Sequence, residues 1–210
     1  MFSEHNLQRI HDAVRAAEQR TRGEIVPMIV PASGIYRETR HLLGGSLALL
    51  MLAVLLLLNY GGWSAEFPPA WIMLAVLAAY LTGHYLGSWP VFVRLLADPQ
   101  RMDMKVRRRA EAAFYEHGLH RTREGTGILI LISLLERRVQ VLADKAINEK
   151  VPPETWHHLV QELIHAIKKG RATEGLCRMI LQCGELLAQH FPARAGDNPD
   201  ELGDDLIQQR

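Results

Sequence analysis

The sequence predicts an α/β protein whose single core is interrupted by two transmembrane helices. Three observations lead to this fold class. Two apolar runs long enough to cross a bilayer lie at Leu42–Leu58 and Trp71–Trp89. The residues on either side of them alternate between helical periodicity and short apolar runs typical of strands. Charged residues are almost confined to these flanks, because His41–Val93 contains no Lys or Arg, and Glu66 is its only acidic residue.

The first part of the chain predicts a helix followed by a strand. Ser3 has the side chain of a good N-cap, and apolar residues then recur with helical spacing up to about Arg20. Gly23 ends this pattern, and the apolar segment Glu24–Val30 is typical of a strand. Because Pro27 has no N–H to donate to a neighbouring strand, it predicts an edge strand or a bulge.

The two apolar runs predict a transmembrane hairpin with spans near residues 41–60 and 70–89. Each run extends over about 30 Å as a helix, which is the thickness of the hydrocarbon core. The alternative is a pair of buried core helices, but such helices are usually amphipathic, and Leu47–Leu58 is apolar on every face. Aromatic residues typical of the membrane interface lie near the ends of the runs, namely Tyr60, Trp63, Trp71 and Trp89.

The distribution of basic residues predicts the orientation of this hairpin. Arg37 and Arg40 precede the first span, six basic residues follow the second between positions 94 and 109, and the connecting loop Gly61–Pro69 has none. The positive-inside rule therefore places both termini and the soluble domain in the cytoplasm. The basic run Lys105–Arg109 either contacts anionic lipid headgroups or forms a solvated helix face.

The soluble pattern resumes after the hairpin. A continuous apolar run of strand length, Gly127–Leu134, is suited to a central strand covered on both faces. A tight turn joins it to Val139–Asp144, and strands connected so closely pair antiparallel. The remaining predicted elements are a helix from Asp103 to about His117 or His120, a helix from Pro152 or Pro153 to Gly170, a helix from about Thr173 to His190, and a polar tail whose segment 201–207 could dock.

Neither flank can bury its apolar faces alone, so we expect the two flanks to form one α/β/α core. The predicted organisation is a first part of the domain at residues 1–37, the inserted hairpin at 38–98, the remainder of the domain at 99–192, and a polar tail at 193–210. A long insertion is tolerable because loop-closure entropy grows only logarithmically with length. A hairpin also returns the chain to the side of the membrane that it left.

The sequence contains no strong catalytic motif and, with a net charge of +1, no indication of nucleic-acid binding. Asp144 is notable because it follows a strand and begins the segment DKAINEK. It is predicted to cap the next helical turn. The alternative is an oxygen ligand of calcium or another divalent cation, assisted by Glu24 or Glu136. His84 is also notable because ionisable groups are costly inside a membrane, although it could lie at the interface beside Trp89.

Three segments resemble the TPM-domain family: AEQRTRGEIVPMIV, EHGLHRTREGTGILILISLLERRVQVLADKAI and GELLAQHFPARAGDNPDEL. The matching residues are Glu18, Thr21, Gly23, Glu24, Gly127, Glu136, Arg137, Asp144, His190, Phe191 and Pro192. Within the family, the segments resemble the bacterial membrane branch, which has a hairpin inserted after the first strand. The resemblance implies a three-layer α/β/α sandwich around a small mixed sheet, in the bacterial inner membrane. Relatives include thylakoid proteins of photosystem repair and an animal receptor accessory protein, and some have been proposed to bind calcium or to be acid phosphatases.

Two functions are compatible with these observations. The first is a membrane-anchored cytoplasmic interaction domain, with the lipid bilayer and other membrane proteins as partners, that binds or helps to maintain a membrane protein complex. The second is a divalent-metal-dependent, phosphatase-like hydrolase that uses Asp144. The surroundings of Asp144 discriminate between them, because a metal site needs at least two further carboxylate oxygens, whereas a lone capping carboxylate favours the interaction domain.

Overall fold

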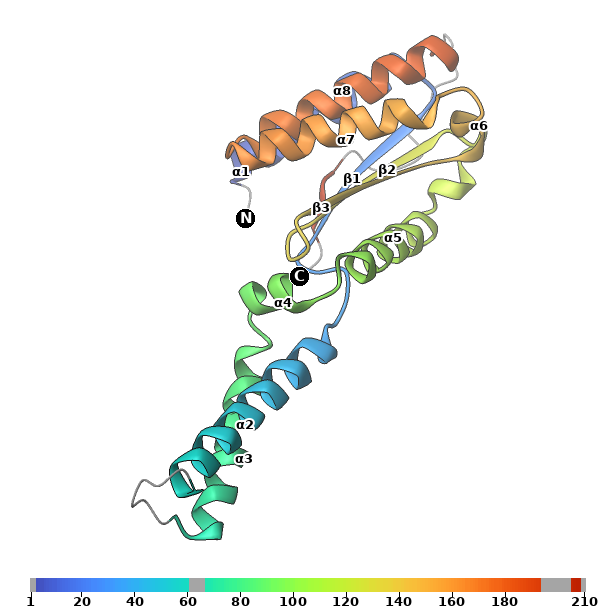
Figure 1. Cartoon of the computed structure of the whole chain (residues 1–210). Helices are drawn as coiled ribbons and strands as arrows, with labels where there is room; N and C mark the ends of the chain where they lie inside the picture. The colour runs from blue at the N-terminus through green and yellow to red at the C-terminus, as the bar shows by residue number, and fades with distance from the viewer. Residues whose placement is uncertain (1–2, 61–66, 194–204, 209–210) are drawn as a thin grey trace. The chain divides into compact units, whose positions relative to one another are not determined.

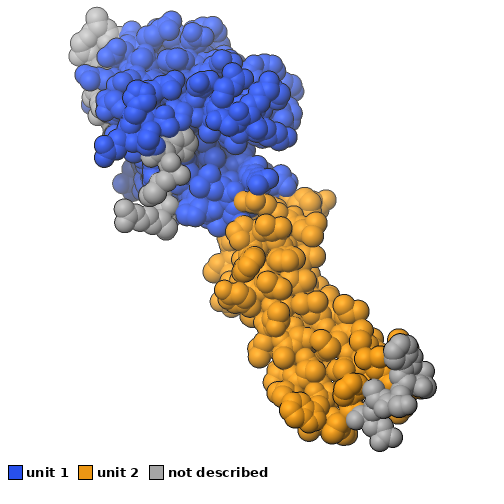
Figure 2. Space-filling model, turned by 90° about the vertical axis from the view of Figure 1, so that its left-hand side faces the viewer, with its two compact units in different colours: residues 1–33, 103–210 blue, residues 34–102 orange. Residues whose placement is uncertain are grey.

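The computed structural model describes residues 3–60, 67–193 and 205–208. The chain divides into two compact units, one formed by residues 1–33 and 103–210 and the other by residues 34–102 (Figure 2). In the order of the chain, the second unit follows the first strand and precedes most of the helix that leads to the second strand (Figure 1).

The first unit contains a mixed sheet with the strand order β3-β2-β1-β4. β1 (Glu24–Val30) pairs in parallel with β2 (Gly127–Ser133). β3 (Arg138–Ala143) pairs antiparallel with β2, as predicted for two strands joined by a tight turn. Because β1 and β2 are parallel, the chain must cross over between them. The crossover contains α5 (Pro99–Glu116). The short strand β4 (Ile207–Gln208) is parallel to β1, and it overlaps at Ile207 the tail segment 201–207 that the sequence suggested could dock.

Helices cover both faces of this sheet (Figure 1). One face packs against α1 (Glu4–Glu18), α7 (Pro153–Lys168) and α8 (Ala172–His190). The other face packs against α5 and the 3₁₀ turn η1 (Leu119–Arg121). The arrangement confirms the predicted three-layer α/β/α sandwich around a small mixed sheet.

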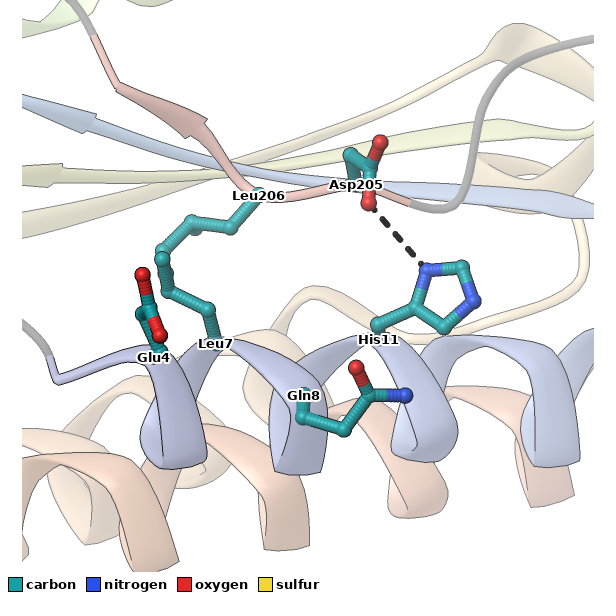
Figure 3. A pocket seen from close by; sticks show the side chains of 6 residues that line it. All are labelled: Glu4, Leu7, Gln8, His11, Asp205 and Leu206. Carbon is teal, nitrogen blue, oxygen red and sulfur yellow. Dashed lines mark ion pairs between the residues drawn. The ribbon is translucent and has the colours of Figure 1, made fainter.

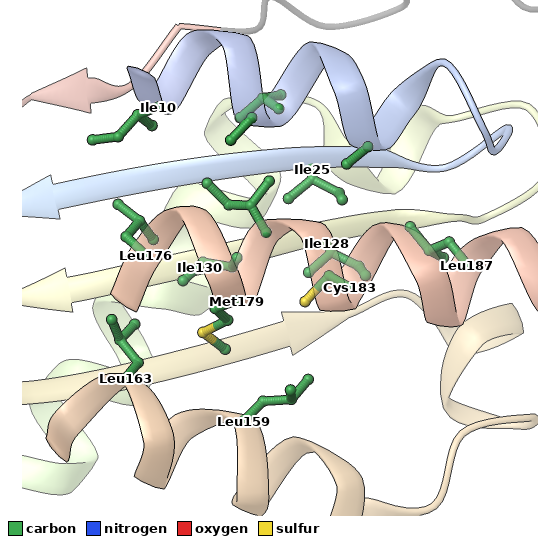
Figure 4. Close-up of a cluster of buried hydrophobic side chains, with 14 of the residues drawn as sticks. Ile10, Ile25, Ile128, Ile130, Leu159, Leu163, Leu176, Met179, Cys183 and Leu187 are labelled. Atoms are coloured by element: carbon green, nitrogen blue, oxygen red, sulfur yellow. The ribbon is translucent and has the colours of Figure 1, made fainter. Parts of the chain in front are cut away.

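Side chains along β2 alternate between the two cores. Ile128, Ile130 and Ile132 belong to the core beneath α1, α7 and α8, whereas Leu129 and Leu131 belong to the core beneath α5. Figure 4 shows Ile128 and Ile130 among side chains of these three helices. Because both faces of the strand are covered, residues 128–132 are all apolar, which explains the uninterrupted run in the sequence. Each fully buried side chain of this size contributes about 1.5–3 kcal/mol.

Pro27 lies inside β1, which is not the outermost strand of the sheet, so the predicted edge strand requires a correction. The N–H of Glu24 is directed towards β2, while that of Ile25 donates to the Glu18 carboxylate at 2.8 Å on the opposite side. Since successive amides of a strand alternate in direction, position 27 also faces away from β2. The missing N–H therefore removes no bond to β2. β4 pairs with Met28–Ile29, so among the described residues its pairing with β1 begins only after Pro27.

The second unit contains α2 (Arg37–Tyr60), α3 (Pro69–Leu86) and α4 (Pro90–Leu96). Among the described residues, α2 and α3 are the two helices that are long and apolar enough to cross a membrane, by length and composition. Only 6% of the apolar window of each is buried. This low burial disagrees with the alternative of two core helices, which would be mostly covered by protein.

The ends of these helices differ from those predicted. α2 begins at residue 37 and not near 41, and α3 ends three residues before Trp89. Gly87 is the C-cap of α3, and Pro90 starts α4 at its first position, where a missing N–H has no intrahelical partner to lose. Residues 61–66, which include Trp63 and most of the predicted outer loop, lie outside the described residues.

Candidate functional site

Asp144 lies between β3 and the short helix α6 (Lys145–Asn148), where it is the N-cap. Its Oδ1 atom accepts the N–H of Lys145 at 2.6 Å. Its own N–H donates to the carbonyl of Gly127 at 2.9 Å, which continues the ladder between β2 and β3. The carboxylate also lies beside Gly125, which has a φ of +66° and whose hypothetical Cβ would be 3.5 Å from Oδ2. These are the contacts of a capping carboxylate.

Glu136 lies in the turn between β2 and β3 and is only 6% exposed. Its carboxylate accepts the N–H of Ser33 at 3.0 and 3.2 Å and the hydroxyl of Ser133. The Ser33 hydroxyl in turn donates to the Ser133 hydroxyl oxygen at 2.8 Å. Glu136 thus ties the chain leaving β1 to the end of β2.

The structure does not bring the three predicted carboxylates together. Glu24 pairs with Gly127 at the start of β1 and β2, and Asp144 follows the end of β3 at the same end of the sheet. Glu136 lies at the opposite end of β2. Within residues 3–60, 67–193 and 205–208, no three His, Cys, Asp or Glu side chains are grouped as metal ligands. The three carboxylates therefore do not form one metal site, and metal binding by Asp144 with Glu24 or Glu136 stays a prediction.

The residues that resemble the family motif before β1 hold the end of α8. The Thr21 hydroxyl donates to the carbonyl of Phe191 at 2.8 Å, and Thr21 is 1% exposed. The Nε of Arg22 donates to the carbonyl of Pro192 at 2.9 Å, and its guanidinium pairs with Glu124. Each of these contacts joins the first flank of the chain to the second. We conclude that this part of the motif stabilises the split core.

A pocket of about 440 Å³ lies between α1 and the residues around β4 (Figure 3). Its lining residues are Glu4, Leu7, Gln8, His11, Asp205 and Leu206. Nδ1 of His11 lies 3.2 Å from the Asp205 carboxylate. A carboxylate in this position orients an imidazole, but none of the lining residues supplies a hydroxyl or thiol nucleophile beside it. Sequence reasoning missed the pocket because its two walls come from opposite ends of the chain.

The two cysteines lack the environment of a reactive thiol. Burial raises the pKa of Cys183 from its ordinary value of 9.0 to about 12. Burial also raises the pKa of Cys177, and the opposing effect of the nearby Arg9 charge is smaller. A nucleophilic cysteine needs a lowered pKa, so neither thiol indicates covalent catalysis.

The second unit contains a further group of polar side chains, formed by His41, Tyr80 and His84. The sequence drew attention to His84 alone. His41 and Tyr80 were not recognised because their proximity depends on how α2 and α3 pair. A sequence signal for that pairing does exist, since Gly83 and Gly87 have the spacing of small residues at membrane helix contacts.

The fold and these sites define an α/β/α sandwich with an inserted pair of apolar helices and without an assembled catalytic set in its described residues. Residues 88–186 match the family profile described as the TPM domain. The fold is similar to the NMR structure of the BA42 protein from the psychrophilic bacterium Bizionia argentinensis, with a TM-score of 0.62 and 19% identity over 100% of this chain and 96% of that chain. Comparison with functionally curated proteins gives no match. The profile match over residues 88–186 thus supports the resemblance of the sequence to the TPM-domain family.

Proposed function

We propose that this protein is a membrane-anchored interaction domain of the bacterial inner membrane, which binds or helps to maintain a membrane protein complex from the cytoplasmic side. The observation that carries the proposal is the exposure of large apolar side chains along α2 and α3. Leu49, Leu57 and Met73, for example, are 69%, 72% and 74% exposed. Apolar area left in water costs about 25 cal/mol per Å², and a bilayer removes that cost.

The short helix α4 supports an anchored arrangement. Val93 is buried within the second unit, whereas Val91 and Leu95, one turn apart, are 65% and 76% exposed. A helix of a water-soluble protein would carry polar residues on this outer face. Trp89, which precedes α4, is also half exposed, and tryptophan is typical of the membrane interface. We therefore expect α4 to lie in the headgroup region.

The surroundings of Asp144 support a binding role over the phosphatase-like hydrolase. Calcium and magnesium sites combine several oxygen ligands, often from more than one carboxylate. Asp144 instead caps α6, and Glu136 is engaged by two serines at the other end of the sheet. A membrane interaction domain needs no such cluster, and its anchor places the α/β/α sandwich beside other membrane proteins.

Reporter fusions test the anchored topology. A reporter inserted at position 65 should be periplasmic, while reporters placed after Ser33 and at the C-terminus should both be cytoplasmic. The fusion after Ser33 is the matched control, because it carries no hairpin and should stay cytoplasmic and unanchored. If the reporters at position 65 and at the C-terminus lie on the same side, or if the full chain is released from membranes by alkaline carbonate, the proposal is wrong.

A further inference from the structure

A polar cluster lies between the two apolar helices of the second unit. His41 is in the second turn of α2, and Tyr80 and His84 are one turn apart on α3. Ionisable side chains are rare in helices of this composition because they are costly to place in hydrocarbon, and where they occur they mark functional sites by default. Finding three such groups together, contributed by both helices, requires an explanation that anchoring alone does not supply.

The geometry of the cluster is compact. Nδ1 of His41 lies 2.9 Å from the hydroxyl oxygen of Tyr80. The ring centroids of His41 and His84 are 5.1 Å apart, with the planes inclined by 59°. Two imidazoles that share a tetrahedral zinc ion, at about 2.0–2.1 Å from each nitrogen, have centroids about 5 Å apart. The spacing of the two rings therefore fits two ligands of one shared metal ion.

The backbone around the cluster is fixed by a close helix contact. A Cβ at Gly83 would lie 2.7 Å from the Leu43 carbonyl oxygen and 2.8 Å from the Cα of Gly44. The contact thus requires glycine at position 83. One turn further along α3, the buried Thr39 hydroxyl donates to the carbonyl of Gly87 at 3.0 Å. These contacts fix the helix backbones that carry the two histidines, and a pre-organised backbone favours binding.

The nitrogen atoms of the two rings are differently engaged. With its proton on Nδ1, His41 donates to Tyr80 and leaves the Nε2 lone pair for a metal, and metal-binding histidines commonly have such an orienting partner. Nδ1 of His84 is buried and makes no hydrogen bond within the part of the chain that the structure describes. A buried ring nitrogen without a hydrogen bond is costly unless a ligand satisfies it.

We propose that His41 and His84 bind one divalent ion of the late first transition series, such as zinc, with Tyr80 as the positioning residue of His41. Imidazole nitrogen suits zinc, copper and nickel, whereas calcium and magnesium need oxygen ligands. The protein supplies two ligands, so water or other oxygen donors complete the coordination. The site is distinct from Asp144, and it depends on the pairing of α2 with α3, whether or not the reporter fusions support the predicted topology.

Zinc titration of the untagged full chain in detergent tests the site by calorimetry. The wild type should bind one ion at this site, and H41Q or H84Q should each weaken that binding more than about tenfold. The Y80F variant should bind zinc with an affinity between those of the wild type and H41Q. The control is H158Q, because His158 is 73% exposed on α7 and lies outside the second unit. If H41Q and H84Q bind zinc as tightly as the wild type does, the inference is wrong.

A spectroscopic measurement covers the case in which a variant alters the pairing of the helices. One equivalent of Cu²⁺ bound to the wild type should give an electron paramagnetic resonance spectrum with at least two nitrogen ligands. The same spectrum should persist in H158Q. A spectrum with fewer nitrogen ligands, or no binding of zinc or copper up to millimolar concentrations, would leave His41 and Tyr80 as a hydrogen-bonded contact between helices and overturn the metal site.

Discussion

Asp144 is the residue at which the two proposed functions differ most. As an N-cap, it supplies one oxygen to the N–H of Lys145, and asparagine can make the same bond. We therefore expect D144N to leave the free energy of unfolding almost unchanged and D144A to lower it by about 1 kcal/mol. Chemical unfolding of the full chain in detergent measures both values, and D144A is the matched control for loss of the cap.

Calcium provides the second half of this test. Under the capping assignment, millimolar calcium or magnesium changes the melting temperature of neither the wild type nor D144N. Replacement of Asp144 by asparagine would weaken the binding of calcium or magnesium, because asparagine brings no negative charge. If calcium raises the melting temperature of the wild type by several degrees and D144N removes that rise, the carboxylate is a ligand, and the hydrolase becomes the better hypothesis.

At the level of single residues, the sequence predicts local roles better than long-range ones. The cap at Asp144 was predictable because a strand, an aspartate and a helical segment follow one another directly. The contact of Glu136 with Ser33 was not predictable, since Ser33 is 103 residues away. The pairing of His11 with Asp205 was missed for the same reason. Such contacts depend on the packed fold, and no periodicity in the sequence encodes them.

The pairing of α2 with α3 gives a prediction for two glycines of the hairpin. G83A should weaken the pairing by about 1–3 kcal/mol, because its Cβ would meet backbone atoms of Leu43 and Gly44 that cannot move aside. G45A is the control, since nothing lies within 4 Å of a Cβ there and alanine favours a helix. Unfolding in increasing sodium dodecyl sulfate, followed by circular dichroism, measures both. Equal stability of the two variants would contradict this contact.

At the scale of helices and strands, the elements that bury much apolar surface were easier to predict from the sequence than those that bury little. β2 is covered on both faces and therefore appears in the sequence as an unbroken apolar run. β4 pairs through two residues only, too few for a strand pattern. The end of α3 was misplaced because the segment Gly87–Trp89 is uncharged like the helix before it, although the chain turns there before Pro90. Composition therefore predicts the presence of a long apolar helix well and the residue at which it ends poorly.

At the scale of the whole molecule, the insertion has closely spaced ends. Ser33, the last residue of the first flank, donates its N–H to Glu136 in the turn between β2 and β3. Asp103, the first residue of the second flank, pairs with Arg138 at 2.5 Å, just after the same turn. Both ends of the α/β/α sandwich therefore lie beside one turn. A short linker can join them, which agrees with a hairpin inserted into an otherwise continuous crossover.

Removal of the second unit tests this view of the molecule. A variant that lacks residues 34–102, with Ser33 joined to Asp103 by a short flexible linker, should be soluble, monomeric and cooperatively folded. Its circular dichroism should show both helix and strand. The control is the same variant with I130D, because Ile130 is fully buried in β2, and an unpaired charge there costs several kcal/mol, comparable to the stability of a small domain. If the shortened chain is expressed but unfolded, while the full chain in detergent is folded, the second unit is required for the core, and the division into an anchor and an independent domain is wrong.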